Sequence, residues 1–292
     1  MDELFVRDVL SSEFPQWDDL IRRSSQGSVF LRSDFLQMLC QSDPTLNLKI
    51  IGCFTSKGDL RAGQALVYRN FLGICIGYDS SFFYNGPILP LVNYDSRAQK
   101  AEIENTYLTL LGNEISRRFP HISHVTHPSI TDLRPLIRLG WKANLHYTHV
   151  WHLEQDRDVW NRIRRCERRM IKTGEEKFTF NTECWNEVKV EFLRTLKICY
   201  QRLGWTPGKT WMDIFCERMK WMDTHNISRI ITARDCTGVL IGAIICIVSN
   251  EDHTAYFWKI TYDPDYIKDG IMPALCYKSY QAVPEDCTRI DW

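Results

Sequence analysis

Arginines are concentrated in one stretch of the sequence. Residues 161–172 read NRIRRCERRMIK, with six basic side chains against a single acid, Glu167. Helical periodicity places Arg164 and Arg168 one turn apart on a helix predicted over residues 156–173. Adjacent guanidinium groups bind phosphate oxygens bidentately, so this helix is a candidate site for substrate phosphates. A solvated basic face is the alternative.

Histidines recur with a spacing of three. Six of the eight form two H-x-x-H-x-x-H runs: His121, His124, His127, His146, His149 and His152. Their β-branched and aromatic neighbours predict strands over residues 121–127 and 140–153, on which residues three apart face opposite sides. We therefore expect no metal site. His127, at a predicted strand end before Pro128, is a candidate general base, and a partly buried structural histidine is the alternative.

A strand predicted over residues 254–263 presents a second group of candidates. Period two places Tyr256 and Trp258 on one face and Lys259 on the other. Tyr256 is a candidate proton donor to a leaving group, and Trp258 is a candidate for substrate binding. Asp291, in the last predicted strand, is a candidate proton acceptor from an amine. Packing in the core is the alternative for both aromatic rings.

Composition limits the class of protein. The 292 residues carry 36 basic and 36 acidic side chains, which argues against long nucleic acid as the main partner. No apolar run is long enough to span a membrane, and the N-terminus lacks signal-peptide features. The eleven cysteines contain no C-x-x-C pair, so we expect reduced thiols and a cytoplasmic protein. No Walker loop, dinucleotide loop or G-x-S-x-G motif is present.

The order of predicted elements suggests two α/β domains, over residues 1–154 and 155–292, with a duplicated plan and mixed, mostly antiparallel sheets flanked by helices. Strands are expected at 5–10, 46–54, 61–70, 71–77, 121–127, 140–153, 177–181, 229–235, 239–249, 254–263 and 287–292. Helices are expected at 15–26, 34–41, 96–119, 132–139, 156–173, 185–203, 209–224 and 269–280.

Trp205 and Trp211 flank a Pro-Gly link between two helices; they are candidates for the floor of a sugar or acyl site, and helix packing is the alternative.

Two segments carry a family resemblance. Residues 260–275, ITYDPDYIKDGIMPAL, resemble the strand–loop–helix of the GNAT N-acyltransferase superfamily. Residues 14–292, which include VFLRSDFL at 29–36, resemble its FemAB-like, BioF2-like branch. The resemblance implies two tandem GNAT-like (acyl-CoA N-acyltransferase) modules. It also implies that Tyr84 and Asn85, in the turn sequence FYNGPIL, line a cleft between the modules; a plain surface turn is the alternative.

The resemblance further implies transfer of an acyl or aminoacyl group, from acyl-CoA or aminoacyl-tRNA, to an amine. The neutral net charge favours acyl-CoA as the donor. The acceptor would be a small molecule of sugar or phosphate character, such as a nucleotide-linked amino sugar or a cell-envelope precursor. Asp269 and Gly270 would bind donor phosphates at a helix start. At the family's loop positions, Ile267, Gly270 and Met272, only Gly270 matches, and the family's Phe-Lys segment is absent. A non-catalytic binding protein with the same fold is the alternative; the oligomeric state is not indicated.

Overall fold

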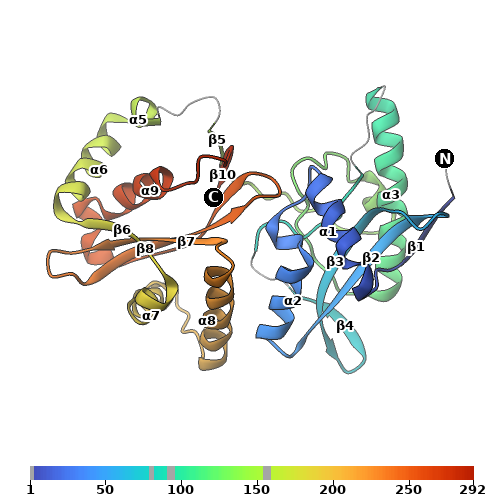
Figure 1. Cartoon of the computed structure of the whole chain (residues 1–292), viewed down its shortest axis with the longest axis horizontal. Helices are drawn as coiled ribbons and strands as arrows, with labels where there is room; N and C mark the ends of the chain where they lie inside the picture. Colours follow the sequence, from blue (N-terminus) through green and yellow to red (C-terminus); the bar gives the residue numbers. More distant parts are fainter. Residues whose placement is uncertain (1–2, 79–81, 91–95, 154–158) are drawn as a thin grey trace. The chain divides into compact units, whose positions relative to one another are not determined.

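The structure, a computed structural model, describes residues 3–78, 82–90, 96–153 and 159–292. The chain forms two compact units, Met1–Tyr147 and Thr148–Trp292 (Figure 1). The predicted division after residue 154 leaves the short strand β5 (Val150–His152) with the first domain, whereas the structure pairs β5 with a strand of the second sheet.

In the described part of the first unit, four antiparallel strands form one sheet in the order β1-β2-β3-β4. The strands are β1 (Leu4–Asp8), β2 (Leu46–Thr55), β3 (Leu60–Phe71) and β4 (Ile74–Gly77). The helices are α1 (Phe14–Arg23), α2 (Ser33–Ser42), α3 (Arg97–Arg118) and α4 (Arg134–Arg138), with two 3₁₀ turns, Ser11–Glu13 and Val29–Leu31.

Both faces of this sheet are covered by helices. One face buries apolar residues of β2 and β3 against α3, and these form a core of Ile51, Cys53, Ala62, Leu66, Leu108, Leu111 and Ile115. Toward the other helices, the fully buried indole of Trp17 on α1 lies against Gly63 of β3, where a Cβ would be 2.8 Å from the ring. Its Nε1 donates a hydrogen bond to the carbonyl of Leu31 at 2.7 Å.

In the second unit, the sheet order is β5-β10-β9-β8-β7-β6 among the described residues; β9 and β10 are parallel and the other neighbours antiparallel. The further strands are β6 (Thr179–Glu183), β7 (Ser228–Arg234), β8 (Leu240–Ser249), β9 (Thr254–Tyr262) and β10 (Arg289–Asp291). The helices are α5 (Val159–Arg162), α6 (Arg165–Lys177), α7 (Trp185–Arg202), α8 (Lys209–Thr224) and α9 (Ile271–Gln281), with a 3₁₀ turn at Pro264–Asp269.

The two units repeat one plan. In each, a strand, two helices, a three-strand antiparallel meander and a helix follow in that order, and the first strand pairs with the first strand of the meander. In the first unit these are β1, α1, α2, β2 to β4 and α3; in the second they are β6, α7, α8, β7 to β9 and α9. The structure thus confirms the predicted α/β class and the predicted duplication.

Three predicted elements differ from the structure. Residues 121–127 are not a strand: His121 makes one isolated bridge, and the side-chain Oδ1 of Asn85 accepts the N–H of Val125 at 2.6 Å in place of a ladder bond. The strand predicted at 140–153 is reduced to β5. The helix predicted at 156–173 falls partly outside the described residues, and it breaks at Arg164, whose extended backbone (ψ 145°) separates α5 from α6.

Helices α6 and α9 approach each other closely through two glycines. Gly270, immediately before α9, has a left-handed backbone (φ 81°), and a Cβ there would lie 2.1 Å from the carbonyl oxygen of Met170. On α6, a Cβ at Gly174 would lie 2.6 Å from the Cβ of Ala274. Only glycine fits at Gly270, because a side chain would need both an unfavourable φ and space that backbone occupies.

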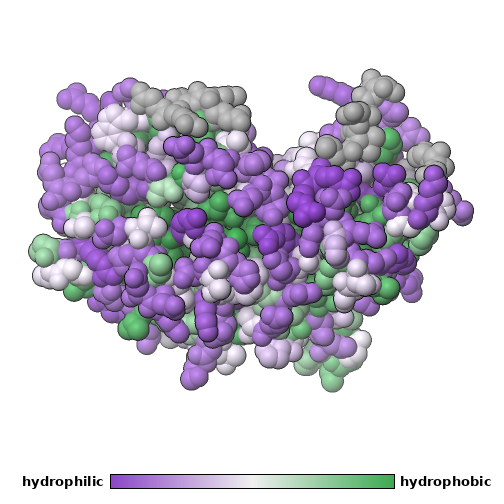
Figure 2. All heavy atoms as spheres, viewed as in Figure 1, coloured by the Kyte–Doolittle hydropathy of each residue, from purple (hydrophilic) through white to green (hydrophobic). Residues whose placement is uncertain are grey.

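Hydrophilic residues cover most of the face seen in Figure 2, with hydrophobic residues in smaller areas between them. Within the described ranges, every helix is too short or too polar to cross a lipid bilayer.

Gly270→Ala tests the α6–α9 contact, with Gly238→Ala as the matched control. Gly238 has a similar φ of 84° but no atom within 4 Å of its would-be Cβ. The control isolates the backbone cost, about 1 kcal/mol. Gly270→Ala should lower the free energy of unfolding of the second unit by a further ~1–3 kcal/mol because of the overlap. Urea unfolding measures both; equal losses would contradict the packing described here.

Protonation of His124 should make the stability of the first unit depend on pH. Its Nδ1 lies 3.1 Å from Nε2 of Gln64, its ring packs against Trp141, and burial lowers its pKa from 6.5 to about 4. The unfolded chain therefore binds a proton near pH 6.5 that the folded chain does not bind until about pH 4. Stability should fall by about 2 kcal/mol between pH 7.5 and 5 and less in His124→Gln. Urea unfolding at both pH values, with an NMR titration of the imidazole, checks this; an imidazole pKa near 6.5 would refute it.

Candidate functional site

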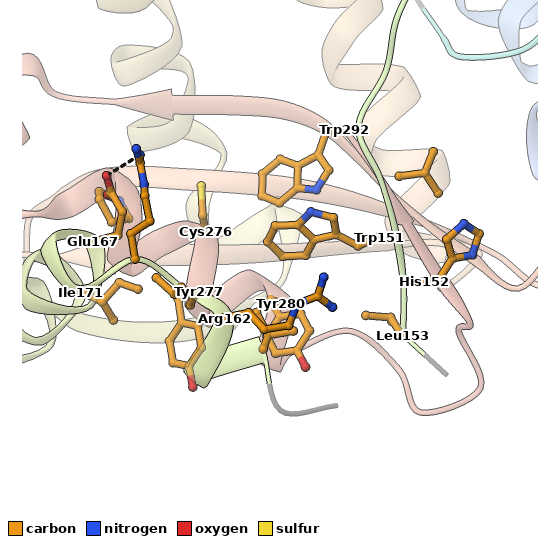
Figure 3. Close-up of a pocket in the computed structure, with 15 residues that line it drawn as sticks. Trp151, His152, Leu153, Arg162, Glu167, Ile171, Cys276, Tyr277, Tyr280 and Trp292 are labelled. Carbon is orange, nitrogen blue, oxygen red and sulfur yellow. Dashed lines mark hydrogen bonds and ion pairs between the residues drawn. The ribbon is translucent and has the colours of Figure 1, made fainter. Parts of the chain in front are cut away.

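The second unit contains a cavity of about 650 Å³ beside the edge of its sheet (Figure 3). One side is formed by β5 and by Trp292, directly after β10. The other sides come from α5, the start of α6 and one face of α9. The lining residues are Val150, Trp151, His152, Leu153, Val159, Arg162, Ile163, Arg164, Glu167, Ile171, Pro273, Cys276, Tyr277, Tyr280 and Trp292.

Aromatic rings form the wall of this cavity nearest the sheet. The pairing of β5 with β10 places Trp151 opposite Ile290, next to Trp292, and the two indoles meet edge to face with centroids 5.3 Å apart. Tyr280, on α9, lies 6.1 Å from Trp151. The Nε1–H of Trp292 is buried and has no acceptor among the described residues. A buried donor of this kind calls for an acceptor from water or a ligand.

Two guanidinium groups line the same cavity, from the break between α5 and α6. Figure 3 shows the Arg162 side chain directed toward the rings of Trp151 and Tyr280. Arg164 is ion-paired with Glu167 at 3.2 Å, and both side chains are exposed. The structure thus brings the predicted Arg164 to the cavity together with Arg162, whereas the predicted Arg168 does not line it.

The cavity offers no reactive thiolate at neutral pH. Cys276 is the cysteine of the lining, and burial raises the pKa of its thiol to about 11. A thiol rather than a thiolate therefore lines the wall, and it is a poor nucleophile. Among the described residues, no three His, Cys, Asp or Glu side chains are grouped as metal ligands. The cavity is thus suited to holding a ligand by ring faces and guanidinium groups.

Strand β9 contains an extra residue that changes its pattern of faces. Ile245 of β8 pairs with Lys259, but the next residue, Cys246, pairs with Phe257, so Trp258 has no partner in the ladder. This is a β-bulge. Trp258 stacks on Phe215 of α8 with centroids 5.7 Å apart. Lys259 Nζ lies 3.5 Å from Tyr200 Oη of α7. The prediction that Lys259 faces away from Trp258 is therefore wrong.

Tyr256 and Asp291 are brought together, since they are partners in the parallel β9–β10 register. Both are almost fully buried. Tyr256 Oη donates a hydrogen bond to Asp252 Oδ2 at 2.6 Å, and an Asp291 carboxylate oxygen accepts one from the Thr148 hydroxyl. Burial raises the pKa of Asp252 despite these hydrogen bonds. Each predicted group thus has a hydrogen-bond partner inside the unit.

Tyr84, Asn85 and His127 also lie together, in the first unit. The Tyr84 and His127 rings pack edge to face at 5.0 Å, and His127 Nδ1 lies 2.8 Å from Ser129 Oγ. Tyr84 and Asn85 line a cavity of only about 20 Å³. That is room for about one water molecule, so within this unit these residues form a packed polar cluster.

Comparison with solved structures identifies the fold. FemX aligns with 98% of this chain and 88% of its own, with a TM-score of 0.66 and 11% identity. A tandem GNAT protein from the clavulanic acid biosynthesis pathway aligns over 99% and 89%, with a TM-score of 0.55 and 9% identity. L-PGS from Bacillus licheniformis aligns over 95% and 74%, with a TM-score of 0.53 and 13% identity. The chain has a tandem GNAT fold.

The expected resemblance to FemAB-like and tandem GNAT proteins is thus confirmed at the level of the fold. No protein-family profile matches the chain, and no curated protein matches it. In the second GNAT module, the loop before α9 contains Asp269 and Gly270, the two residues that the sequence predicts to bind donor phosphates.

The start of α9 does not fit a pyrophosphate. Gly270 is buried, and the space a side chain would take there is filled by the backbone of α6. Pro273 removes one N–H from the first turn. Asp263, Asp265 and Asp269 stand against Lys268 in the turn before the helix, and Asp269 is ion-paired with Lys177 at the end of α6, so the turn offers no net positive charge to a phosphate. In this GNAT fold, Asp269 and Gly270 join α9 to α6.

The state of Cys276 can be tested by alkylation with iodoacetamide at pH 8. With a pKa of about 11 rather than 9, its thiolate fraction is about 100-fold smaller than that of an ordinary thiol. Cys276 should therefore react at least ~100-fold more slowly than the exposed Cys236 of the same unit. Mass spectrometry of peptides after timed quenching measures both rates, and the unfolded protein should show equal rates. Comparable rates in the folded protein would contradict the assignment.

Proposed function

We propose that the protein transfers an acyl or aminoacyl group to the amine of a small acceptor that carries sugar and phosphate groups, such as a nucleotide-linked amino sugar or a cell-envelope precursor. The tandem GNAT fold supports the transfer half of this proposal, since FemX and the tandem GNAT protein of clavulanic acid biosynthesis share it. The observation that carries the acceptor half is the cavity of the second unit.

The lining of this cavity matches such an acceptor chemically. Its volume is within the usual range for small-molecule sites. The faces of Trp151 and Tyr280 suit the apolar face of a sugar or a nucleobase. Arg162 would hold a phosphate by charge-assisted hydrogen bonds, and the Trp292 N–H would find its acceptor on the ligand.

The crowded start of α9, which offers no net positive charge, bears on the identity of the donor. A coenzyme A donor needs a site for its pyrophosphate, and Asp269 with Gly270 does not provide one. An aminoacyl ester at the end of a tRNA does not need a pocket of that kind, because its phosphates lie along an exposed backbone. We therefore favour aminoacyl-tRNA over acyl-CoA. The acceptor nitrogen attacks the donor carbonyl, a C–N bond forms, the ester C–O bond breaks and the amine loses a proton.

We assign the proton transfer to none of the three residues that the sequence suggested. Tyr256 and Asp291 are buried and hydrogen-bonded where β9 meets β10, and we propose that they hold that junction. His127 belongs to the packed cluster of the first unit. These same contacts favour a second candidate function, a binding protein that keeps the cavity and the fold but performs no transfer.

Arg162→Ala tests the cavity as the acceptor site, with Arg169→Ala as the control, because Arg169 is an exposed arginine of α6 outside the cavity. UDP-glucosamine serves as the probe, and quenching of tryptophan fluorescence measures binding. Arg162→Ala should weaken binding about 10- to 100-fold through the loss of a charge-assisted contact to phosphate. Arg169→Ala should change it less than twofold. Equal effects, or no binding by the native protein, would reject the assignment.

Transfer itself separates the two candidate functions. The protein is incubated with UDP-glucosamine and, in parallel, with aminoacyl-tRNAs or acyl-CoA thioesters, and the acceptor is weighed by mass spectrometry. An added aminoacyl or acyl mass that requires both substrates supports the transferase. Saturable binding with unchanged acceptor mass across all donors supports the binding protein.

A further inference from the structure

Four of the basic residues between 161 and 172 lie outside the cavity of the second unit. Arg162 and Arg164 line the cavity, whereas the other four belong to α6 and do not. We term these four the basic face: Arg165, Arg168, Arg169 and Lys172. Arg165, Arg169 and Lys172 are exposed, and Arg168 is half-buried. The proposed acceptor site therefore gives the basic face no role.

The basic face is one side of α6. With 3.6 residues per turn, its four members fall within an arc of roughly 100°. Gly174, on the opposite side, is buried against Gly270 and Ala274 where α6 packs on α9 (Figure 1). The face ends at Glu176, an exposed acid one turn after Lys172. The four cations thus point away from the core of the unit.

The charges of the basic face are not neutralised by neighbouring carboxylates. On the flank of α6 toward α9, Glu175 pairs with Lys278 at 2.7 Å and Lys177 pairs with Asp269. No member of the basic face forms an ion pair with any residue in the described part of the chain. Since the whole chain has equal numbers of basic and acidic residues, the face is a local concentration of positive charge.

This distribution of charge is unfavourable for the helix alone. Arg165 and Arg169 are one turn apart, as are Arg168 and Lys172, and like charges at this spacing destabilise a helix. Arg165 is also the first residue of α6, where the positive end of the helix dipole disfavours a cation. A polyanion bound along the face offsets both effects, because its phosphates supply the negative charges that the fold does not.

The chemistry of the basic face favours a sugar-phosphate backbone as its partner. Three of its four members are arginine, which binds phosphate oxygens bidentately. The face contains no aromatic ring to stack on bases and no apolar side chain to enter a lipid layer. In the view of Figure 2, hydrophilic residues cover the region of α6. We therefore expect binding that depends on phosphates and is independent of base sequence.

The basic face begins where the cavity ends. Arg164, which lines the cavity, directly precedes Arg165, so a strand that follows α6 toward its first residue arrives at the cavity. We propose that the basic face of α6 binds the phosphate backbone of a tRNA next to its aminoacylated end. This proposal rests on the proposed function, in which that end delivers the transferred group to an acceptor in the cavity.

Binding of RNA is tested without any transfer. Fluorescence anisotropy measures the affinity of the full chain for labelled, deacylated tRNA over a range of salt concentrations. Arg165→Ala/Arg169→Ala should weaken binding ~10-fold or more, and it should reduce the slope of log Kd against log salt by about 2, one for each lost phosphate contact. Circular dichroism checks that the variant keeps its helices.

Lys189→Ala/Lys197→Ala is the matched control. It removes two exposed cations from α7, which lies on the other side of the sheet from α6 and α9 (Figure 1). The control should change the affinity for tRNA less than twofold. Equal losses in the two double variants would show attraction by net charge alone and overturn the proposal. Binding of vesicles that contain phosphatidylglycerol through the same arginines, without binding of tRNA, would assign the face to a membrane and also overturn it.

The outcomes also separate this proposal from the proposed function. With aminoacyl-tRNA as donor, Arg165→Ala/Arg169→Ala should raise KM for the tRNA ~10-fold and leave kcat and UDP-glucosamine binding within twofold, because neither residue lines the cavity. If the native protein transfers from acyl-CoA and does not bind tRNA, the basic face has no RNA partner while the transfer stands. If it binds tRNA through α6 and transfers nothing, the proposed function fails and the docking surface stands.

Discussion

A single extra residue in β9 determines which side chains meet on both faces of the second sheet. Up to Phe257, odd-numbered residues of β9 face the core that α9 covers; beyond Trp258, even-numbered residues such as Ile260 do so. Without this shift, the amine of Lys259 would lie among the apolar residues of the α9 face, where a charge has no solvent and no partner. The bulge thus keeps one core apolar and places an amine among rings on the other face.

The same shift shows where reasoning from the sequence reached its limit. Two long segments were predicted correctly: α3 and β8 lie within one residue of their expected bounds, because α3 begins at a capping serine, Ser96, and β8 is a continuous apolar run that is buried throughout. A bulge leaves no mark in the alternation of residue types, so Lys259 was assigned to the wrong face. Residues 121–127 have strand-like composition, but the Asn85 side chain takes one of their backbone N–H groups.

The cavity was only partly predictable for a related reason. Arg164 was found from local charge density, which sequence displays directly. Trp151 and Trp292 lie far apart in the chain, and only the pairing of β5 with β10 brings their rings together. The sequence did not indicate Arg162 as a site residue, because an unbroken helix was predicted through Arg164. The break at Arg164 directs both arginines toward one cavity. Contacts that depend on strand order require the fold to be known.

The pairing of β5 with β10 has a consequence for biosynthesis. Residues 150–152 leave the ribosome long before residues 289–291, yet they are neighbours at the edge of the sheet. Helix α6 likewise cannot complete its packing before α9 is made, because Gly174 of α6 lies against Gly270 and Ala274. The first unit has α1 to α3 and its meander in place by residue 118, so it can begin to fold during translation. The second must keep β5 and α6 unpaired until β10 and α9 have emerged, and contacts between such distant segments form slowly.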